Sequence, residues 1–242
     1  MNSIIESLLE RKSVRSFTEQ AISPEDKQLI LTAAMAAPTA GNQQMYTILD
    51  ITDQQLKDTL AETCDHQPFI AKAPMVLIFC ADFQKWYDAF CAADCHPRTP
   101  GTGDFMLAVQ DAAIAAQNAV TASQSLGIGS CYIGDIMENY EIHRDLLHLP
   151  EYVFPALMLV FGYPTKQQLE RRKPKRAPLE FIVHENNYHR LSDEELAKGM
   201  GQNRGSQSFN EWMQAFCKRK YHSDFSLEMT RSVEEALKNF RR

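Results

Sequence analysis

The chain has 242 residues, of which 44% are apolar and 23% are charged, a composition typical of one large globular domain or two small ones. Its 25 Lys and Arg against 31 Asp and Glu give a formal charge of −6. Proteins that bind nucleic acid or anionic membranes usually carry a basic excess, so this net charge argues against both partners. Six cysteines are too few for a secreted disulfide framework, and the N-terminal MNSIIESLLE is too polar for a signal peptide. We therefore expect a cytoplasmic protein with reduced thiols, and neither nucleic acid nor membrane as a partner.

Helices and strands are expected to alternate in the first half of the chain. Ser3 and Glu6 have capping-box spacing ahead of an apolar stripe, which predicts a first helix. Ser23 and Pro24 predict the N-cap and first residue of a second helix, which stops before Pro38. The elements expected next, after a turn-rich loop, are a strand over 45–52, a helix over 53–64 and a strand over 73–82.

The second half begins with an alanine-rich run that predicts a long buried helix over 104–126. The elements expected after it are a strand over 130–136, a helix over 139–148, a strand over 154–164 and a polar helical tail. Strands separated by helices indicate a sheet between helical layers. The charged tail over 185–242 carries aromatic residues but no core of its own, so a symmetric partner subunit is the simplest surface for it to pack on.

A first cationic segment, RKSVRSF, follows the first helix at residues 11–17. Arg11, Lys12 and Arg15 surround Ser13, and guanidinium forks with a hydroxyl are the groups that bind phosphate through charge-assisted hydrogen bonds. A basic helix end is also favoured by the helix dipole. Both interpretations stay open from these residues alone.

A second cationic segment lies about 160 residues later and contains Arg171, Arg172, Lys173, Lys175 and Arg176. Such a run resembles a nuclear-localisation or nucleic-acid patch. It stands, however, directly after an expected core strand and before the apolar LEFIV. We hypothesise that the two segments bind one phosphate group from two sides.

The glycines exclude two common nucleotide motifs. Gly127, Gly129 and Gly134 are not spaced as G-x-G-x-x-G, and the chain has no P-loop. Gly134 fits either a β-bulge or a backbone that must lie close to a flat ligand.

Cys91, Cys95 and His96 suggest a metal or redox site, although ordinary thiols are the simpler interpretation because a second spaced pair is missing. No motif of a serine hydrolase or zinc protease occurs. A chain with phosphate-binding residues and no evident acid–base machinery is typical of cofactor chemistry.

Five segments in order, RKSVRSF, PTAGNQQ, LGIGSCYIG, FGYP and KPKRAP leading to VHEN, resemble the flavin-dependent nitroreductase family. Within the family, they are most similar to its NADPH-dependent flavin reductase and oxygen-insensitive nitroreductase branch. The resemblance covers residues 3–190, with the tail matching more loosely. It implies an α+β fold with a central mixed, mostly antiparallel sheet, a flavin-binding core over 1–190, and a helical C-terminal arm over 191–242 that packs on the partner of a homodimer.

The resemblance also implies bound FMN and ping-pong transfer of hydride from NAD(P)H to nitroaromatics, quinones or flavins. It does not implicate a catalytic side chain. The residues implied in FMN binding are Arg11, Lys12, Ser13, Arg15, Asn42, Gln67, Ile133, Gly134, Lys173, Lys175 and Arg176. Of these, Arg15 would support the negative charge of the reduced ring.

The sequence departs from the family in two places. Pro174 displaces the usual K-x-R spacing, so either Lys173 or Lys175 could accompany Arg176. For the NADPH 2′-phosphate only Arg204 is present, and Glu138 replaces a neutral residue. We therefore expect a weakened preference for NADPH.

Two other functions remain as alternatives from the sequence. One is a reductase that releases free reduced flavin. The other is a nucleic-acid-binding module that uses the two cationic segments at residues 11–15 and 171–176.

Overall fold

The computed structural model describes residues 2–241, which form two compact units. The first unit runs to Arg171 and resumes at Glu228, and the second is Arg172–Leu227. The boundary between the units lies after Arg171, whereas the flavin-binding core was expected to end at residue 190. That functional boundary stays a prediction.

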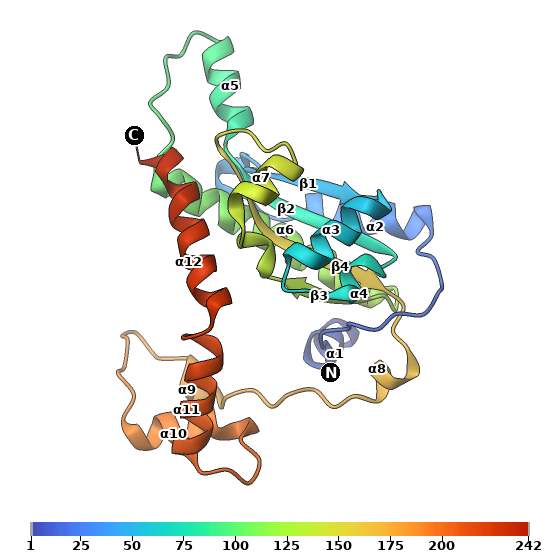
Figure 1. The fold of residues 1–242 in the computed structure, drawn as a ribbon, viewed down its shortest axis with the longest axis vertical. Helices are drawn as coiled ribbons and strands as arrows, with labels where there is room; N and C mark the ends of the chain where they lie inside the picture. Colours follow the sequence, from blue (N-terminus) through green and yellow to red (C-terminus); the bar gives the residue numbers. More distant parts are fainter. Residues whose placement is uncertain (1, 242) are drawn as a thin grey trace. The chain divides into compact units, whose positions relative to one another are not determined.

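The first unit is built around a four-stranded sheet in the order β1-β2-β4-β3, with every neighbouring pair antiparallel (Figure 1). Its strands are β1 (Tyr46–Ile51), β2 (Met75–Asp82), β3 (Gly129–Ile133) and β4 (Val153–Gly162). Its helices are α1 (Ser3–Glu10), α2 (Pro24–Met35), η1 (Ala40–Asn42), α3 (Gln54–Thr63), α4 (Pro68–Ala71), α5 (Gln84–Ala92), α6 (Thr102–Ser125), η2 (Asp135–Met137), α7 (Tyr140–Leu146), α8 (Lys166–Glu170) and η4 (Lys238–Phe240).

The second unit is helical. It contains α9 (Leu179–Ile182), α10 (Asp193–Met200), η3 (Gly201–Asn203) and α11 (Phe209–Lys220). The last long helix, α12 (Asp224–Leu237), begins in the second unit and ends in the first.

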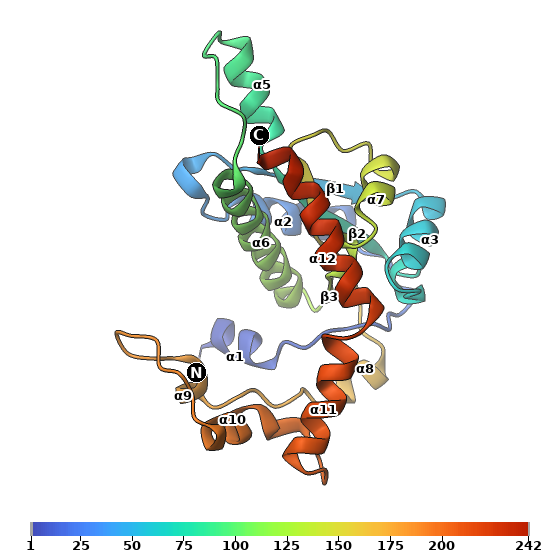
Figure 2. The ribbon, with the colours of Figure 1, turned by 60° about the vertical axis from the view of Figure 1, so that its left-hand side comes forward.

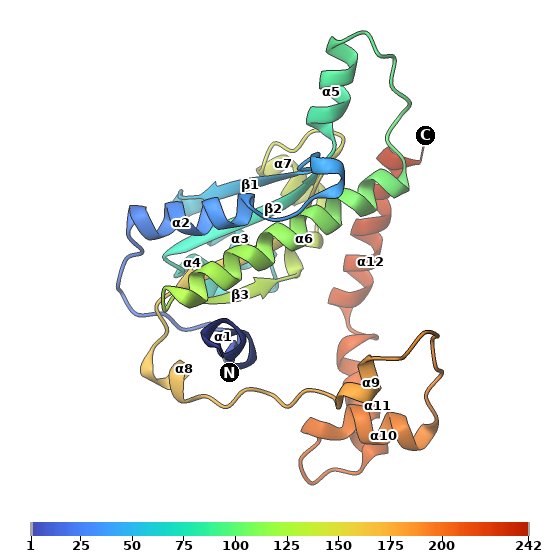
Figure 3. The ribbon, with the colours of Figure 1, turned by 180° about the vertical axis from the view of Figure 1, so that it is seen from behind.

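Helices cover both faces of the sheet, which explains why every residue of β2 is buried. Its odd-numbered residues, such as Leu77 and Phe79, pack in the core with α2 and α6, and its even-numbered residues, such as Ile78, pack with α3 and α4. Figure 3 shows α6 and α2 lying across one face. The sequence prediction of an α+β fold with a mostly antiparallel sheet is confirmed. Its parallel component is a single bridge between Ser13 and Ser130.

Two local predictions were inaccurate. The N-cap of α1 is Asn2, whose side chain accepts a hydrogen bond from the Ile5 backbone nitrogen, so the helix begins as predicted but its cap lies one residue earlier than expected. No helix was expected between the strand over 73–82 and the helix over 104–126, but α5 lies there and extends away from the sheet in Figure 2. The partly buried side chains of Trp86 and Tyr87 pack α5 against the core. No helix among residues 2–241 is both long and apolar enough to cross a membrane.

Candidate functional site

The first cationic segment lies across the end of the sheet. The Val14 nitrogen donates to the Ser130 carbonyl at 3.0 Å, and the Thr18 nitrogen donates to the Tyr163 carbonyl at 2.8 Å. The side chain of Val14 is buried in this position. The segment is therefore fixed by backbone hydrogen bonds beside β3 and β4.

Two glycines make this close approach possible. Gly129 and Gly162 face each other in the β3–β4 register. A Cβ atom on Gly129 would lie 2.6 Å from Val14 Cγ2, and one on Gly162 would lie 2.6 Å from Phe17 Cδ1. Since such distances are not tolerated, glycine at both positions allows the cationic segment to lie on the sheet.

Arg11 has the strongest sign of a missing anionic ligand. Its Nε and Nη2 atoms are buried and have no hydrogen-bond partner in the described part of the chain. Its guanidinium carbon lies 5.6 Å from the centroid of the Tyr132 ring, which holds the side chain against β3. Because buried N–H groups of arginine are almost always paired, an anionic oxygen is the partner that would satisfy them.

Ser13 and Arg15 lie near Arg11 around the buried Cys131. Burial raises the pKa of the Cys131 thiol, while the positive charges of Arg15 and Arg11 and a hydrogen bond from Ser13 oppose the rise. Three residues expected in FMN binding, Arg11, Ser13 and Arg15, thus lie around one residue of β3. The site has the positive charge and the hydroxyl group that a phosphate needs.

Lys12, unlike Arg11, already has hydrogen-bond partners within the chain. Its Nζ atom donates to the carbonyl oxygens of Leu169 and Arg171, each at 2.6 Å. Two of its three N–H groups therefore hold the chain at the start of the second cationic segment, and one remains for a ligand. No local sequence pattern indicates these carbonyl partners, because they lie more than 150 residues away from Lys12.

A second group of expected residues meets where β3 turns into η2. Gln67 Nε2 donates to the Cys64 carbonyl at 2.8 Å and to Asp135 Oδ2 at 3.0 Å. Ile133 is buried, whereas a Cβ on the exposed Gly134 would meet only Met137 Cε, at 4.0 Å. The β3–β4 register has no shift and Gly134 follows the last residue of β3, so the bulge interpretation is wrong. The backbone at Gly134 is open to a flat ligand.

Asn42 is exposed at the end of η1, with a φ of +58°. Its loop is fixed by Asp111 of α6, a carboxylate that is only 2% exposed. Asp111 accepts hydrogen bonds from the backbone nitrogens of Ala40 at 3.0 Å and Met45 at 3.1 Å. Sequence reasoning missed Asp111, because its partners Ala40 and Met45 lie 71 and 66 residues away in the chain.

The remaining expected site residues belong to the second unit. The Lys175 backbone exchanges hydrogen bonds of 3.0 and 2.9 Å with the Asn203 side chain, which brings Lys175 near Arg204. Arg176 lines an apolar cavity of about 810 Å³ together with side chains of α9 and α11. That Lys173, Lys175 and Arg176 meet the first cationic segment stays a prediction.

Cys91, Cys95 and His96 are exposed at and beyond the end of α5. Among residues 2–241, no three His, Cys, Asp or Glu side chains are grouped so that they could hold a metal ion. All six cysteines are free thiols.

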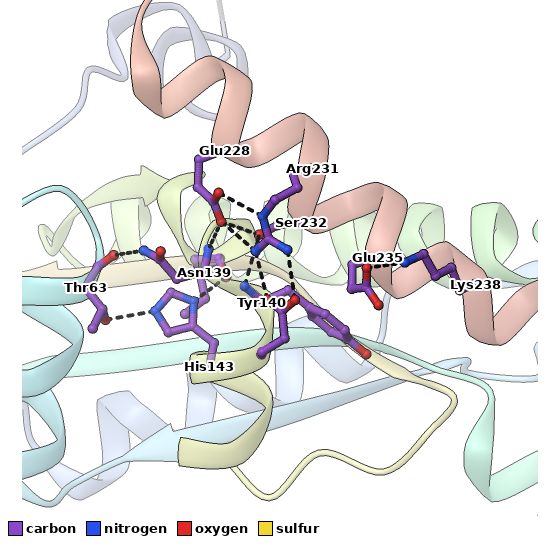
Figure 4. A network of polar contacts seen from close by, with 11 residues as sticks. Thr63, Asn139, Tyr140, His143, Glu228, Arg231, Ser232, Glu235 and Lys238 are labelled. Carbon is purple, nitrogen blue, oxygen red and sulfur yellow. Dashed lines mark hydrogen bonds and ion pairs between the residues drawn. The ribbon is translucent and has the colours of Figure 1, made fainter.

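The segment that follows Gly134 is held by α12, as Figure 4 shows. The Asn139 nitrogen donates to Glu228 Oε1 at 3.1 Å, and the Tyr140 nitrogen donates to Ser232 Oγ at 3.0 Å. Arg231 forms two 2.8 Å hydrogen bonds with the Glu141 carboxylate and also binds Glu228. These hydrogen bonds attach α12 to the segment that directly follows Gly134.

This chain is similar to known proteins over most of its length. The model of the Nitroreductase family matches residues 8–163. A Bacillus subtilis protein named FMN reductase [NAD(P)H] is 32% identical over 237 residues, covering 96% of this chain and 90% of the relative. An oxygen-insensitive NADPH nitroreductase from Salmonella typhimurium is 35% identical over 199 residues, covering 82% of this chain and 80% of the relative.

Solved structures are similar over nearly the whole chain. The structure of NfrA2 from B. megaterium superimposes with a TM-score of 0.82 at 31% identity, covering 98% of each chain. The NADPH:FMN oxidoreductase from Vibrio harveyi, solved with NAD⁺, gives a TM-score of 0.82 at 26% identity, again covering 98% of each chain.

Proposed function

Because the chain belongs to the nitroreductase family, we propose that it is an FMN-dependent NAD(P)H oxidoreductase. The observation that carries this proposal is the Arg11 guanidinium, with two buried nitrogen atoms that lack a partner in the described residues, beside Ser13 and Arg15. When bound, FMN would supply the redox chemistry of a ping-pong reaction between NAD(P)H and a second substrate.

The residues around the start of β3 would bind the phosphate end. Arg11 offers its unpaired N–H groups and Ser13 its hydroxyl, while Lys12 has one N–H group left. Arg176, with Lys173 or Lys175, would close the phosphate from the second unit. Charge-assisted hydrogen bonds to phosphate are about twice as strong as neutral ones, which suits a tightly held cofactor.

The residues at the end of β3 would contact the ring. The exposed backbone at Gly134, next to the buried Ile133, would admit a planar group, and Gln67 and Asn42 would offer amides to its polar edge. Arg15 is exposed and would place a positive charge at the pyrimidine edge, where it stabilises the negative charge that two-electron reduction creates. The protein thus contributes positioning and electrostatics, with no side chain as catalytic acid.

The second substrate is proposed to be a nitroaromatic, a quinone or free flavin. The curated relatives are named both FMN reductase and nitroreductase, which supports this range. When free FMN is the acceptor, the enzyme would act as a flavin reductase. Arg204 would contact the NAD(P)H phosphate.

We also infer a homodimer in which the C-terminal arm packs on the partner subunit. The second unit exposes large apolar side chains, among them Leu179 at 75% and Ile182 at 70%, around its apolar cavity. Exposed apolar patches of this kind typically form interfaces. The six free thiols suit a reducing compartment, so we propose a cytoplasmic location.

The visible spectrum of the purified protein tests the function directly. We expect a yellow protein with the absorption of oxidised flavin, which is bleached by NADH or NADPH without oxygen and restored by a nitroaromatic or a quinone. A colourless protein that does not take up FMN would overturn the proposal. Nucleic-acid binding that falls steeply with salt would then favour the alternative module.

A further inference from the structure

Glu138 is an unexpected group close to the candidate ring site. It stands directly after η2, four residues beyond Gly134, and its side chain is only 5% exposed. Its Oε1 atom is buried and has no hydrogen-bond partner in the described part of the chain. A buried carboxylate in this condition is costly unless it carries a proton or gains a partner.

Asp135 connects Glu138 to Gln67. Asp135 lies close enough to Glu138 for its negative charge to raise the pKa of the Glu138 carboxyl group, and Asp135 Oδ2 accepts from Gln67 Nε2 at 3.0 Å. Burial and a neighbouring acid both favour the protonated form of Glu138. Glu138 is therefore one residue removed from Gln67, which is expected at the flavin.

This arrangement fixes what Gln67 can offer to a ligand. Its amide nitrogen has two hydrogen atoms, and both are used, by the Cys64 carbonyl and by Asp135. Only the amide oxygen remains, so Gln67 can accept a hydrogen bond from a ligand and cannot donate one.

The other charged groups around Glu138 do not stabilise its ionised form. Asp65 approaches from the segment between α3 and α4, and Glu228 approaches from α12. Arg231 is engaged by Glu228 and Glu141. His143 of α7 is kept neutral, because burial lowers its pKa. Burial, followed by repulsion from Asp135, Asp65 and Glu228, raises the pKa of Glu138 to about 7.

We propose that Glu138 is a positioning residue of the flavin site: in its protonated form it adds no charge beside Asp135, which holds Gln67 as a hydrogen-bond acceptor, and loss of the Glu138 proton makes the bound flavin harder to reduce. This inference rests on the proposed function. The proton is released to solvent as the pH rises, and its effect on the flavin is electrostatic, since an added negative charge near the ring opposes the arrival of electrons.

The test is the midpoint potential of bound FMN between pH 5.5 and 9 in the wild type and in Glu138→Gln. Glutamine has the shape of the protonated acid and can donate to Asp135 at every pH. We expect equal potentials at low pH and a lower wild-type potential above about pH 7. A roughly tenfold loss in the relative affinity for reduced FMN corresponds to about 30 mV for a two-electron couple.

Glu62→Gln is the matched control, because it makes the same chemical change on an exposed side chain of α3. Its potential should follow the wild type at every pH. Asp135→Asn is the second variant and serves if Glu138→Gln fails to fold. Without the neighbouring carboxylate, Glu138 should ionise more readily, so the step in potential should move to lower pH.

Parallel curves for the wild type and Glu138→Gln, or an unmoved step in Asp135→Asn, would overturn the inference and leave the proposed function intact. A wild-type protein that binds no FMN would overturn both. Infrared spectra of the apoprotein give a second readout. The stretch of a protonated carboxyl group should be present at pH 6 in the wild type and absent in Glu138→Gln.

Discussion

At the scale of single residues, the site is defined by polar groups that the protein leaves unsatisfied. Arg11 is held by the Tyr132 ring and keeps two buried nitrogen atoms without a partner in the described residues, and Glu138 keeps one buried oxygen in the same condition. Each would cost stability in an ordinary core. An anion would satisfy the nitrogen atoms of Arg11, and a bound proton would remove the charge of Glu138.

Replacing Arg11 tests whether its unpaired nitrogen atoms bind the FMN phosphate. We expect Arg11→Ala to weaken FMN binding roughly 10- to 100-fold, because a hydrogen bond to a charged group contributes about 1.5–3 kcal/mol. Titration of the apoprotein with FMN, followed by flavin fluorescence, measures the change. The exposed Lys166→Ala removes a charge of the same sign and should leave the affinity unaltered. An affinity that Arg11→Ala does not change would remove Arg11 from the site.

The raised pKa of Glu138 also predicts how the stability of the apoprotein depends on pH. The folded protein binds this proton up to about pH 7, whereas the unfolded chain releases it near pH 4.5. The native state therefore holds more protons in this window, so the free energy of unfolding falls as pH rises through it. Denaturant unfolding should show wild type losing stability relative to Glu138→Gln from about pH 4.5 to 7. Identical slopes in the two proteins would contradict the assignment.

At the scale of elements, the paired glycines of β3 and β4 explain how the cationic segment reaches its place. Gly129 admits Val14 and Gly162 admits Phe17, so a short segment crosses the sheet end without a groove of its own. Alternate side chains of β2 pack into the two apolar cores on opposite faces of the sheet, so the sheet lies between helical layers.

Gly129→Ala tests this arrangement. The new methyl group would meet the branched and buried Val14, so we expect a loss of about 1–3 kcal/mol in folding stability, typical of overpacking. FMN affinity should fall with it, because the segment over 11–15 must shift. Thermal unfolding and FMN titration measure both effects. Gly103→Ala is the control, since no atom lies within 4 Å of its Cβ position, and a large loss there would show that glycine replacement alone is harmful.

Most elements could be predicted from local patterns. The apolar run of β2, the alanine-rich α6 and the Ser23-Pro24 start of α2 are signals carried by neighbouring residues. The partners of Lys12, the role of Asp111 and the burial of Glu138 could not be predicted in this way. They depend on contacts between residues far apart in the chain, such as Lys12 with Leu169, which no periodicity records.

At the scale of the whole molecule, the chain leads from the first unit into the helical second unit through the basic segment over 171–176. The core carries the groups expected at the flavin ring and at one side of the phosphate, and the second unit carries Arg176 and Arg204. Family membership establishes the class of enzyme. We expect the preference between NADH and NADPH to depend on two departures of this sequence from the family, the single Arg204 and the acidic Glu138.

We expect NADPH to be favoured only weakly over NADH. Arg204 stands alone where a pair of arginines would bind the 2′-phosphate, since Ser208 and Phe209 occupy the place of the second. A lost charged contact removes about 1.5–3 kcal/mol of discrimination. Steady-state kinetics with both cofactors give the ratio of their kcat/KM values. A strong preference for NADPH would show that another residue supplies the missing charge.

We propose that cationic segments some 160 residues apart in the sequence bind one FMN phosphate, and a double-mutant cycle of FMN binding tests this proposal. Dissociation constants are needed for the wild type, Arg11→Ala, Arg176→Ala and the double variant, by calorimetric titration of each apoprotein. We predict that each single change weakens binding at least tenfold, and that the double variant loses less than the product of the two losses, because both groups act on the same phosphate. Unchanged FMN affinity in Arg176→Ala, or losses that multiply independently, would contradict the account.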